Sequence, residues 1–266
     1  MTQRRRGRPS LSQNTSRLQG GDMDMEEDVS FTQTLTQAQR NLEKHSPEQI
    51  SLKVGELVQY LLIRDQKKLP IKRADIVKNV VKEYKDIYAE LLLRAKKALL
   101  EVFGFQLEEI DTKAHIYILI NTLERGEGDD LKVNDNTAKL GLLTVILSLI
   151  FMKGNTAKEV AIWETLRRLR VDPGERHEDF GDVKKLVTDE FVKQKYLEYN
   201  KVPHTDPPEY EFRWGPRAIK ETSKLKILEF VSKIQQKDPK SWVTQYRDAQ
   251  EIPRSQAPRA STSARS

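Results

Sequence analysis

The sequence has no cysteine, which excludes disulfide bonds, thiolate zinc sites and cysteine nucleophiles. Its most apolar stretch, Leu140 to Met152, is too short to cross a bilayer and predicts a buried helix. The first residues are charged and no apolar run follows them, so we expect no secretory signal peptide. These absences favour a protein of a reducing compartment that spans no membrane.

Sequence motifs of enzyme active sites are also missing. The four histidines, at positions 45, 115, 177 and 204, are scattered and lack the spacing of metal ligands. There is no G-x-S-x-G elbow, no H-E-x-x-H motif and no glycine-rich phosphate loop. Most acidic residues alternate with Lys or Arg on expected helix faces, which is typical of solvated helices. The sequence therefore predicts no enzyme, no metal and no cofactor.

Positive charge is in slight excess and lies largely toward the ends of the chain. Lysine and arginine number 46 against 40 acidic residues, and the pI is near 9.2, which permits a polyanionic partner without requiring one. Residues 1–45 begin with arginines, continue with acidic residues and contain few apolar ones, so we expect a disordered tail there. We expect a second disordered tail at 253–266, which is rich in Ser, Ala, Pro and Arg.

A first folded unit is expected at residues 46–123. Ser46 can cap a helix whose apolar face carries Ile50, Val54 and Val58 at helical spacing. A short helix is expected at 73–82, and a third at 88–103, where Gly104 provides a stop. The buried stripe of that third helix is expected to include Val102 and Phe103. Strands at 105–110 and 115–120 then form a hairpin.

A polar linker, 124–135, leads to a second unit at 136–252 with a similar order of elements. Three helices are expected: one at 140–152, a second that begins at a capping box formed by Thr156 and Glu159, and a third at 183–195. The second of these helices should bury Val160, Trp163, Leu166 and Leu169. Strands follow at 196–202 and 210–214, and two helices, 224–235 and 240–250, complete the unit. The predicted fold is mainly α with small β-hairpins: tandem winged-helix units plus C-terminal helices. In such folds the third helix can enter a major groove, although winged helices also serve purely as protein-binding modules.

Three features of the sequence are candidate binding sites. The first is Gly7-Arg8-Pro9, flanked by arginines, which resembles the AT-hook core that places Arg8 in a narrow minor groove of DNA. The alternatives are a nuclear-import signal and a soluble basic tail.

The second candidate is a basic set near the third helix and hairpin of the second unit, and it could contact DNA phosphates. Its members are Lys184, Lys185, Lys193, Lys195 and Arg213. The alternative is ordinary surface lysine. No cluster of Asn, Gln and Arg indicates base readout, so any binding to duplex DNA should tolerate different sequences.

The third candidate is the pair Leu61 and Leu62 at the end of the first helix. Leu61 continues the stripe of Val54 and Val58, whereas Leu62 lies about 100° further round the helix, because neighbouring helix residues do not share a face. One of the two leucines is therefore expected to be exposed or to contact a partner, and packing of both in the core is the alternative.

The second half of the sequence resembles the MAGE homology domain. The matching stretches are Leu142–Asn155, Trp163–Leu169, Phe180–Thr188, Gln194–Tyr199, Tyr210–Ala218 and Glu221–Lys224. The resemblance extends over about Ser51 to Ile234 and is densest after Leu140. One departure is Arg170, where the family often has glycine at the end of a helix.

This resemblance implies two winged-helix units, no catalysis and a role as partner and activator of a RING-type ubiquitin ligase. The family's ligase-contacting leucine pair corresponds to Leu61 and Leu62. Within the family, His204–Pro207 and Asp238–Trp242 resemble the MAGE subunits of Smc5–Smc6 complexes.

That closer resemblance implies two protein partners besides the Smc5–Smc6 core: a RING-bearing first non-SMC element and a kleisin fourth element. It also implies binding of duplex DNA, recombinational DNA repair, and a place on chromosomes in the nucleus. Large apolar contacts with these partners would require an exposed apolar patch, and Leu225, Leu228 and Val231 are candidates for the kleisin contact, although core packing is equally consistent. The alternative functions are an adaptor of a different RING ligase and a sequence-specific transcription regulator.

Overall fold

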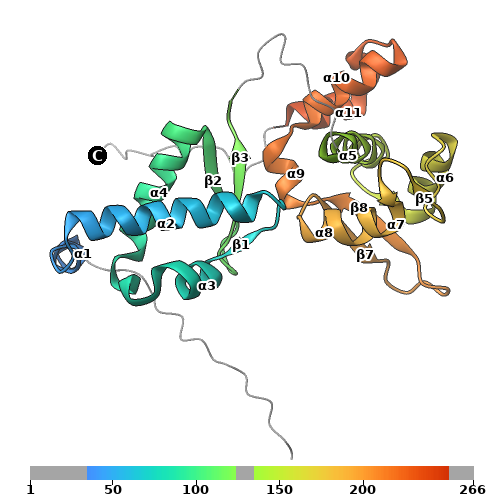
Figure 1. Ribbon diagram of the computed structural model, residues 1–266. Coiled ribbons are helices and arrows are strands. Elements are labelled where there is room, and N and C mark those ends of the chain that lie inside the picture. The colour runs from blue at the N-terminus through green and yellow to red at the C-terminus, as the bar shows by residue number, and fades with distance from the viewer. Residues whose placement is uncertain (1–34, 124–134, 252–266) are drawn as a thin grey trace, which may run out of the picture.

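The computed structural model of the chain describes residues 35–123 and 135–251, and Figure 1 shows two helical units joined by a narrow junction. The first unit is drawn in blue to green and the second in yellow-green to red. The elements of the first unit are α1 (Leu35–Leu42), α2 (Pro47–Asp65), β1 (Ile71–Lys72), α3 (Arg73–Ile76), the π-helical η1 (Val77–Val81), the 3-10 helix η2 (Lys82–Ile87), α4 (Tyr88–Phe103), β2 (Phe105–Asp111) and β3 (Ile116–Asn121).

Local signals in the sequence set the ends of the main helices of this unit. The Ser46 hydroxyl accepts a hydrogen bond from the Gln49 backbone N–H, and the Gln49 side chain accepts one from the Ser46 N–H, which caps α2. Gly104 ends α4 with φ of 66°, a left-handed conformation that glycine adopts without a steric penalty. These expected boundaries are confirmed.

The helix α1 lies inside the segment that the composition predicts to be a disordered tail. Leu42 packs against the core of the first unit, and the Asn41 side chain is buried and donates a hydrogen bond to the Asp86 carbonyl at 3.4 Å. Disorder over the whole of 1–45 is therefore wrong for 35–42, because these tertiary contacts stabilise a short helix of low intrinsic apolarity. The predictions for 1–34, for the linker at 124–134 and for 252–266 concern residues that lie outside the described ones.

The second unit repeats the plan of the first and adds helices after it. Its elements are α5 (Asp135–Met152), β4 (Ala157–Lys158), α6 (Glu159–Arg168), β5 (Arg176–His177), β6 (Gly181–Asp182), α7 (Val183–Lys185), the π-helical η3 (Leu186–Glu190), α8 (Phe191–Lys193), β7 (Leu197–Lys201), β8 (Tyr210–Trp214), α9 (Pro216–Glu221), α10 (Lys224–Gln235), the 3-10 helix η4 (Pro239–Ser241) and α11 (Val243–Gln250). We refer to residues 183–193 as the third helix of this unit.

Both units have the same small antiparallel sheet, in which a two-residue strand pairs with the second strand of the hairpin. The order is β1-β3-β2 in the first unit and β4-β8-β7 in the second. The short strand lies between α2 and α3 in the first unit and between α5 and α6 in the second, as a winged helix requires. The tandem winged-helix fold is confirmed.

The start of α6 differs from the expected capping box. Ala157 and Lys158 are extended and pair with β8, so the helix begins two residues later than Thr156 would require. The Glu159 carboxylate instead accepts hydrogen bonds from Trp163 Nε1 at 2.8 Å and from the Tyr199 hydroxyl at 2.9 Å. Strand pairing thus takes precedence over the local capping motif.

The expected buried face of α6 is also partly wrong. Trp163 and Leu166 are buried as predicted, and Ile162 joins them in the core, but Val160 is 63% exposed and Leu169 is 54% exposed. Residues spaced by three fall about 60° short of a full turn at each step, so Val160 lies off the face that Ile162, Trp163 and Leu166 share. Leu169 lies after Arg168, the last residue of the helix.

Each unit has its own hydrophobic core, and the two cores share no residue among the described segments. Their junction is formed by α9, which packs against β3. Ile118 lies on the face of β3 opposite Tyr117 and Leu119, and it is fully buried. Apolar contact at the junction is therefore narrow, and polar contacts surround it.

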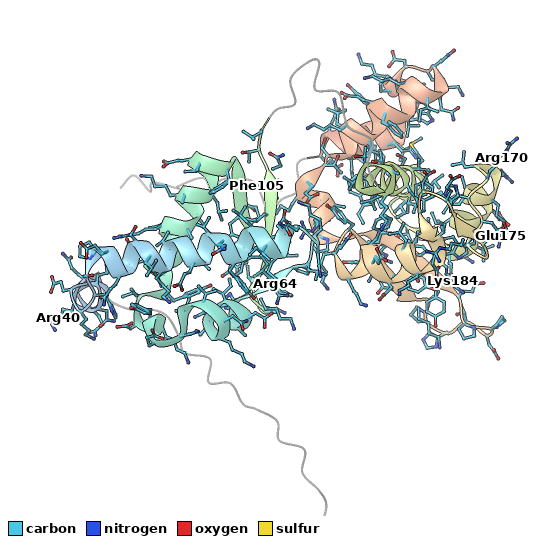
Figure 2. All side chains as sticks on the ribbon, viewed as in Figure 1. Arg40, Arg64, Phe105, Arg170, Glu175 and Lys184 are labelled. Atoms are coloured by element: carbon cyan, nitrogen blue, oxygen red, sulfur yellow. The ribbon has the colours of Figure 1, made fainter. Side chains whose placement is uncertain are left out.

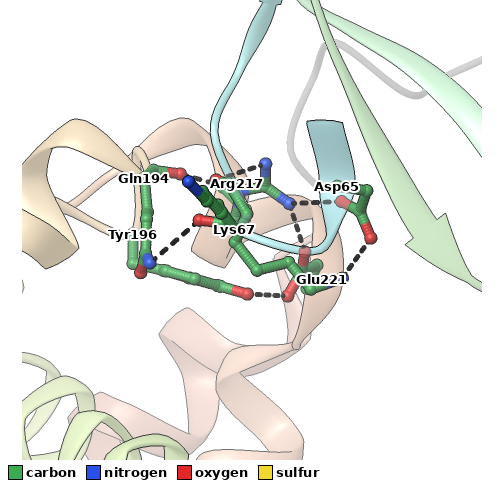
Figure 3. A network of polar contacts seen from close by, with 7 residues as sticks. Asp65, Lys67, Gln194, Tyr196, Arg217 and Glu221 are labelled. Atoms are coloured by element: carbon green, nitrogen blue, oxygen red, sulfur yellow. Dashed lines mark hydrogen bonds and ion pairs between the residues drawn. The ribbon is translucent and has the colours of Figure 1, made fainter. Parts of the chain in front are cut away.

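A buried arginine of α9 forms the centre of that junction (Figure 3). The Arg217 side chain is 0% exposed; its Nε donates to the Gln194 carbonyl at 2.7 Å, and its Nη2 donates to the Lys68 carbonyl at 3.0 Å. Its Nη1 donates to Glu221 at 2.9 Å and lies 3.8 Å from Asp65. One guanidinium thus connects the end of α2 in the first unit to two segments of the second.

Four further contacts support this arrangement. Tyr196 lies beneath the guanidinium, with 5.4 Å between the Arg217 Cζ and the ring centroid, and its hydroxyl donates to Glu221 at 2.7 Å. Burial, and then the Glu221 carboxylate, raise the pKa of Tyr196, so the hydroxyl stays a donor. The Gln194 amide donates to the Lys67 carbonyl at 3.2 Å, and Lys220 pairs with Glu108 at 2.9 Å.

We predict that Arg217→Ala lowers the free energy of unfolding by about 3–5 kcal/mol, because it removes the donor of the Gln194 and Lys68 carbonyls and a neighbouring cation from the Asp65 and Glu221 carboxylates. Chemical denaturation measures this change. Arg213→Ala, at an exposed position of β8, is the control and should change stability by less than about 0.5 kcal/mol. Equal stability of the two variants would contradict a structural role for Arg217.

Arg170 occupies a left-handed position at the end of α6, with φ of 63°. The Val171 N–H donates to the Leu166 carbonyl at 2.9 Å, and the Arg170 N–H donates to the Arg167 carbonyl, which together close the helix end. The position at which this sequence departs from the family's glycine is thus one where glycine is the least strained residue.

We predict that Arg170→Gly raises the free energy of unfolding by about 0.5–1 kcal/mol, because relief of left-handed strain exceeds the added entropy of the unfolded chain. Thermal and chemical denaturation measure the change. The matched control is Arg168→Gly, at the last residue of α6, where the change should lower the free energy of unfolding by up to about 1 kcal/mol. Destabilisation by both changes would show that Arg170 carries no strain.

Candidate protein and nucleic-acid interfaces

An apolar groove of about 560 Å³ lies between α2 and α4 of the first unit. Leu62 lines it together with the exposed side chains of Ile63 and Phe103. The groove is lined by Ser51, Val54, Gly55, Val58, Gln59, Leu62, Ile63, Gln66, Ala98 and Phe103. Large apolar side chains that converge on a surface groove are typical of protein-binding sites.

The leucine pair of α2 is divided between the core and this groove. Leu61 is 0% exposed and belongs to the core cluster, whereas Leu62 is partly exposed. The expected difference in direction is therefore confirmed. A surface contact through Leu61 is contradicted, because its side chain is enclosed by the first unit.

Ile63 and Phe103 are surface residues that the helical pattern of the sequence does not indicate. The apolar spacing predicts Val102 and Phe103 on the buried stripe of α4, but they are 72% and 42% exposed. Their helix ends at Phe103, and Gly104 turns the chain toward β2, so none of the described residues covers the last turn. An apolar pair directly before a helix-terminating glycine was the available signal.

The three leucine and valine candidates for a kleisin contact differ in exposure. Leu228 is 0% exposed and lies in the second core, so the structure contradicts a surface role for it. Leu225 is 37% exposed and Val231 is partly buried, so both remain accessible on α10. Nothing in their surroundings assigns a partner to them.

The basic set of the second unit is spread along the third helix and the hairpin. Lys184 and Lys185 are exposed at the start of this helix, where the Asp182 carboxylate caps the Lys185 N–H at 2.8 Å. Among the described residues, no carboxylate lies within 4 Å of either ammonium group. Figure 2 shows Lys184 at the outer edge of the second unit, far from Arg64 of the first. Both lysines are available to an anionic partner.

The other three members of the set are less available to an anionic partner than Lys184 and Lys185 are. Lys193 pairs with Asp189 at 2.9 Å, and Arg213 pairs with Glu211 at 2.8 Å. Lys195 lies after the helix with φ of 67°, and its side chain is half-buried beside the junction. Arg8 lies outside the described residues.

The hairpin of the second unit is stiffened by stacked aromatic rings. Tyr199 stacks on Tyr210 and on Phe212, with centroid distances of 4.9 and 4.7 Å. Burial, and then its hydrogen bond to Glu159, raise the pKa of the Tyr199 hydroxyl. These contacts attach the hairpin, which carries Arg213, to α6.

The described residues contain no group of three or more His, Asp or Glu side chains placed to hold a metal ion. Three of the histidines lie near single carboxylates: His45 near Asp86, His115 near Glu109 and His177 near Asp179. His204 is exposed in the loop between β7 and β8. In the described part of the chain no helix is both long and apolar enough to cross a membrane.

Comparison with known proteins agrees with this architecture. Residues 57–225 match the model of the MAGE homology domain. The human "Non-structural maintenance of chromosomes element 3 homolog" is 56% identical over 205 residues, which are 77% of this chain and 67% of that protein. The human "Melanoma-associated antigen D2" is 53% identical over 218 residues, which are 81% of this chain and 36% of that protein. A chain solved in the "Nse1-Nse3-Nse4 complex" is 78% identical with a TM-score of 0.76, and the match covers 78% of this chain and 100% of that one.

The family model spans more than half of the sequence, and the two winged-helix units stand where the resemblance implies them. The chain belongs to the MAGE family.

Proposed function

We propose that this protein is a non-catalytic adaptor subunit of an Smc5–Smc6 chromosome complex. The observation that carries the proposal is its 78% identity to a chain solved in the "Nse1-Nse3-Nse4 complex". In this role it binds and stimulates a RING-type ubiquitin ligase subunit, contacts a kleisin subunit, and acts in recombinational DNA repair on chromosomes in the nucleus. Winged helices serve as protein-binding modules as well as DNA readers, which accords with such an adaptor.

The groove between α2 and α4 is the surface that we assign to the RING subunit. Leu62, Ile63 and Phe103 offer apolar side chains at one place, and Leu57 and Leu61 beneath them hold α2 in position. A partner that fills the groove removes these side chains from water, which is the main source of affinity in such interfaces. The RING subunit also supplies the catalytic chemistry that this chain lacks in our proposal.

We predict that Leu62→Ala weakens binding of the RING subunit by about 2 kcal/mol, because the side chain belongs to the apolar centre of the interface. The free energy of unfolding should fall by less than about 1 kcal/mol, since Leu62 is partly exposed. Isothermal calorimetry with the purified RING subunit and chemical denaturation give the two values.

Two matched leucine variants define this test. Leu61→Ala should cost about 2–5 kcal/mol of stability because it opens a cavity in the core. Leu93→Ala, at an exposed position of α4 outside the groove, should change neither stability nor binding. Full affinity of the Leu62→Ala variant would remove the groove from the ligase interface.

We also propose that the second unit binds duplex DNA without strong sequence preference. Lys184 and Lys185 support this proposal, because they are exposed, have no carboxylate within 4 Å among the described residues, and begin the helix that winged-helix proteins place in a major groove. Lysines that contact phosphates provide affinity but no reading of base sequence.

We predict that Lys184→Gln combined with Lys185→Gln reduces the slope of log affinity against log salt concentration by about 1.8 for a random-sequence duplex, since each lost phosphate contact removes about 0.9. Fluorescence anisotropy over a salt series measures the slope.

The control for this pair is Lys226→Gln with Lys233→Gln. Both lysines are exposed on α10 and, among the described residues, have no carboxylate within 4 Å. This control has the same change in net charge, so it separates a local contact from a general electrostatic effect. Equal slopes for the two double variants would exclude Lys184 and Lys185 from the interface.

A further inference from the structure

The junction between the two units carries four lysines on segments that are far apart in the sequence. We refer to them as the junction lysines: Lys67 after α2, Lys72 in β1, Lys113 in the turn between β2 and β3, and Lys195 after the third helix of the second unit. The first three are exposed and Lys195 is half-buried. None has a carboxylate within 4 Å among the residues that the structure describes.

Hydrogen bonds and strand register place these lysines around one region. The Lys67 carbonyl accepts from Gln194, the residue before Lys195. The backbone N–H groups of Ala114 and Lys113 lower the pKa of Asp111, and the charges of Lys113 and Lys195 add to this effect, so both ammonium groups act at the same turn.

Lys72 adjoins the same turn through the sheet of the first unit. In the register of that sheet, Ile116 lies between Lys72 on β1 and Asp111 on β2. Cross-strand neighbours in register share a face of the sheet, so Lys72 and Asp111 lie on the same face. The turn between β2 and β3 is thus bordered by basic side chains from both units.

Neutralisation by nearby acids is limited, because the carboxylates of the junction already have partners. Asp65 bonds to Lys68, Glu221 to Arg217, Glu108 to Lys220, Glu109 to His115, and Asp111 to the backbone of its own turn. The junction lysines are therefore the residual positive charge of this surface.

The third helix of the second unit points from the outer edge of that unit toward this surface. It begins near Lys184, which Figure 2 shows at the far edge, and α8 at its other end adjoins the first unit in Figure 1. Residues 183–193 span about 16 Å. Duplex DNA carries one phosphate charge per roughly 1.7 Å of its axis. A duplex longer than about 16 Å that is held along this helix therefore presents further phosphates beyond the end of the helix.

We propose that the DNA-binding surface crosses the junction, and that Lys67 and Lys113 of the first unit contact phosphates of the same duplex that the second unit holds. The inference rests on the proposed DNA binding and extends it to a unit otherwise assigned to protein contact. Lysine suits this role because its ammonium group acts as a mobile point charge that tolerates variation in phosphate position. A duplex bound in this way contacts both units, on either side of the junction at Arg217.

The test compares the full chain with the Lys67→Gln, Lys113→Gln double variant, using a random-sequence duplex and fluorescence anisotropy over a salt series. We expect the slope of log affinity against log salt concentration to fall by about 1.8. The charge-retaining variant Lys67→Arg, Lys113→Arg should keep the original slope. Unchanged thermal unfolding of both variants confirms that their fold is intact.

The matched control is Lys85→Gln with Lys97→Gln, at exposed positions of η2 and α4 away from the junction. A junction variant that binds like this control, while Lys184→Gln with Lys185→Gln loses affinity, would overturn the extension and leave DNA binding by the second unit intact. A slope reduced by the junction variant alone would support the junction and contradict the assignment of Lys184 and Lys185. Absence of duplex binding by the unaltered chain would overturn both proposals.

Discussion

The buried guanidinium of Arg217 determines how the two winged-helix units are arranged. Each unit encloses its own core, so the hydrophobic effect stabilises the units but specifies little about their relative orientation. Hydrogen bonds are directional, and the planar guanidinium can donate to the carbonyls of Lys68 and Gln194 only when these lie within a narrow range of positions. Because a buried charge without partners is costly, the orientation that satisfies Arg217 is strongly preferred over alternatives.

The junction at Arg217 and the apolar groove both involve α2. Leu62 lines the groove, and Asp65, which borders Arg217, follows it by three residues on α2, so the two lie on neighbouring positions of the same helix face. A partner seated in the groove therefore contacts the element that also positions the second unit. This connection gives a physical route by which a protein contact on one unit can influence the orientation of the other.

Much of the fold follows from local patterns in the sequence. Apolar spacing locates the main helices, Ser46 and Gly104 set two helix ends, and β-branched residues indicate the first hairpin. The errors occur where tertiary contacts outweigh local preference: pairing of Lys158 with β8 displaces a capping box, and α1 forms because Asn41 and its neighbours pack on the first unit. The groove and the joint could not be predicted, because they depend on how α2, α4 and α9 meet, and nothing local indicates that an arginine in a six-residue helix is fully buried.

The adjacent residues Leu61 and Leu62 have different evolutionary consequences. Substitution of Leu61 disturbs the interior of the unit, so selection for folding restricts it to a few apolar residues. Substitution of Leu62 changes the groove at small cost to folding, so folding alone leaves this position open to other residues. Two identical neighbouring residues are thus under different constraints: packing of the core restricts Leu61, whereas only a contact in the groove would restrict Leu62.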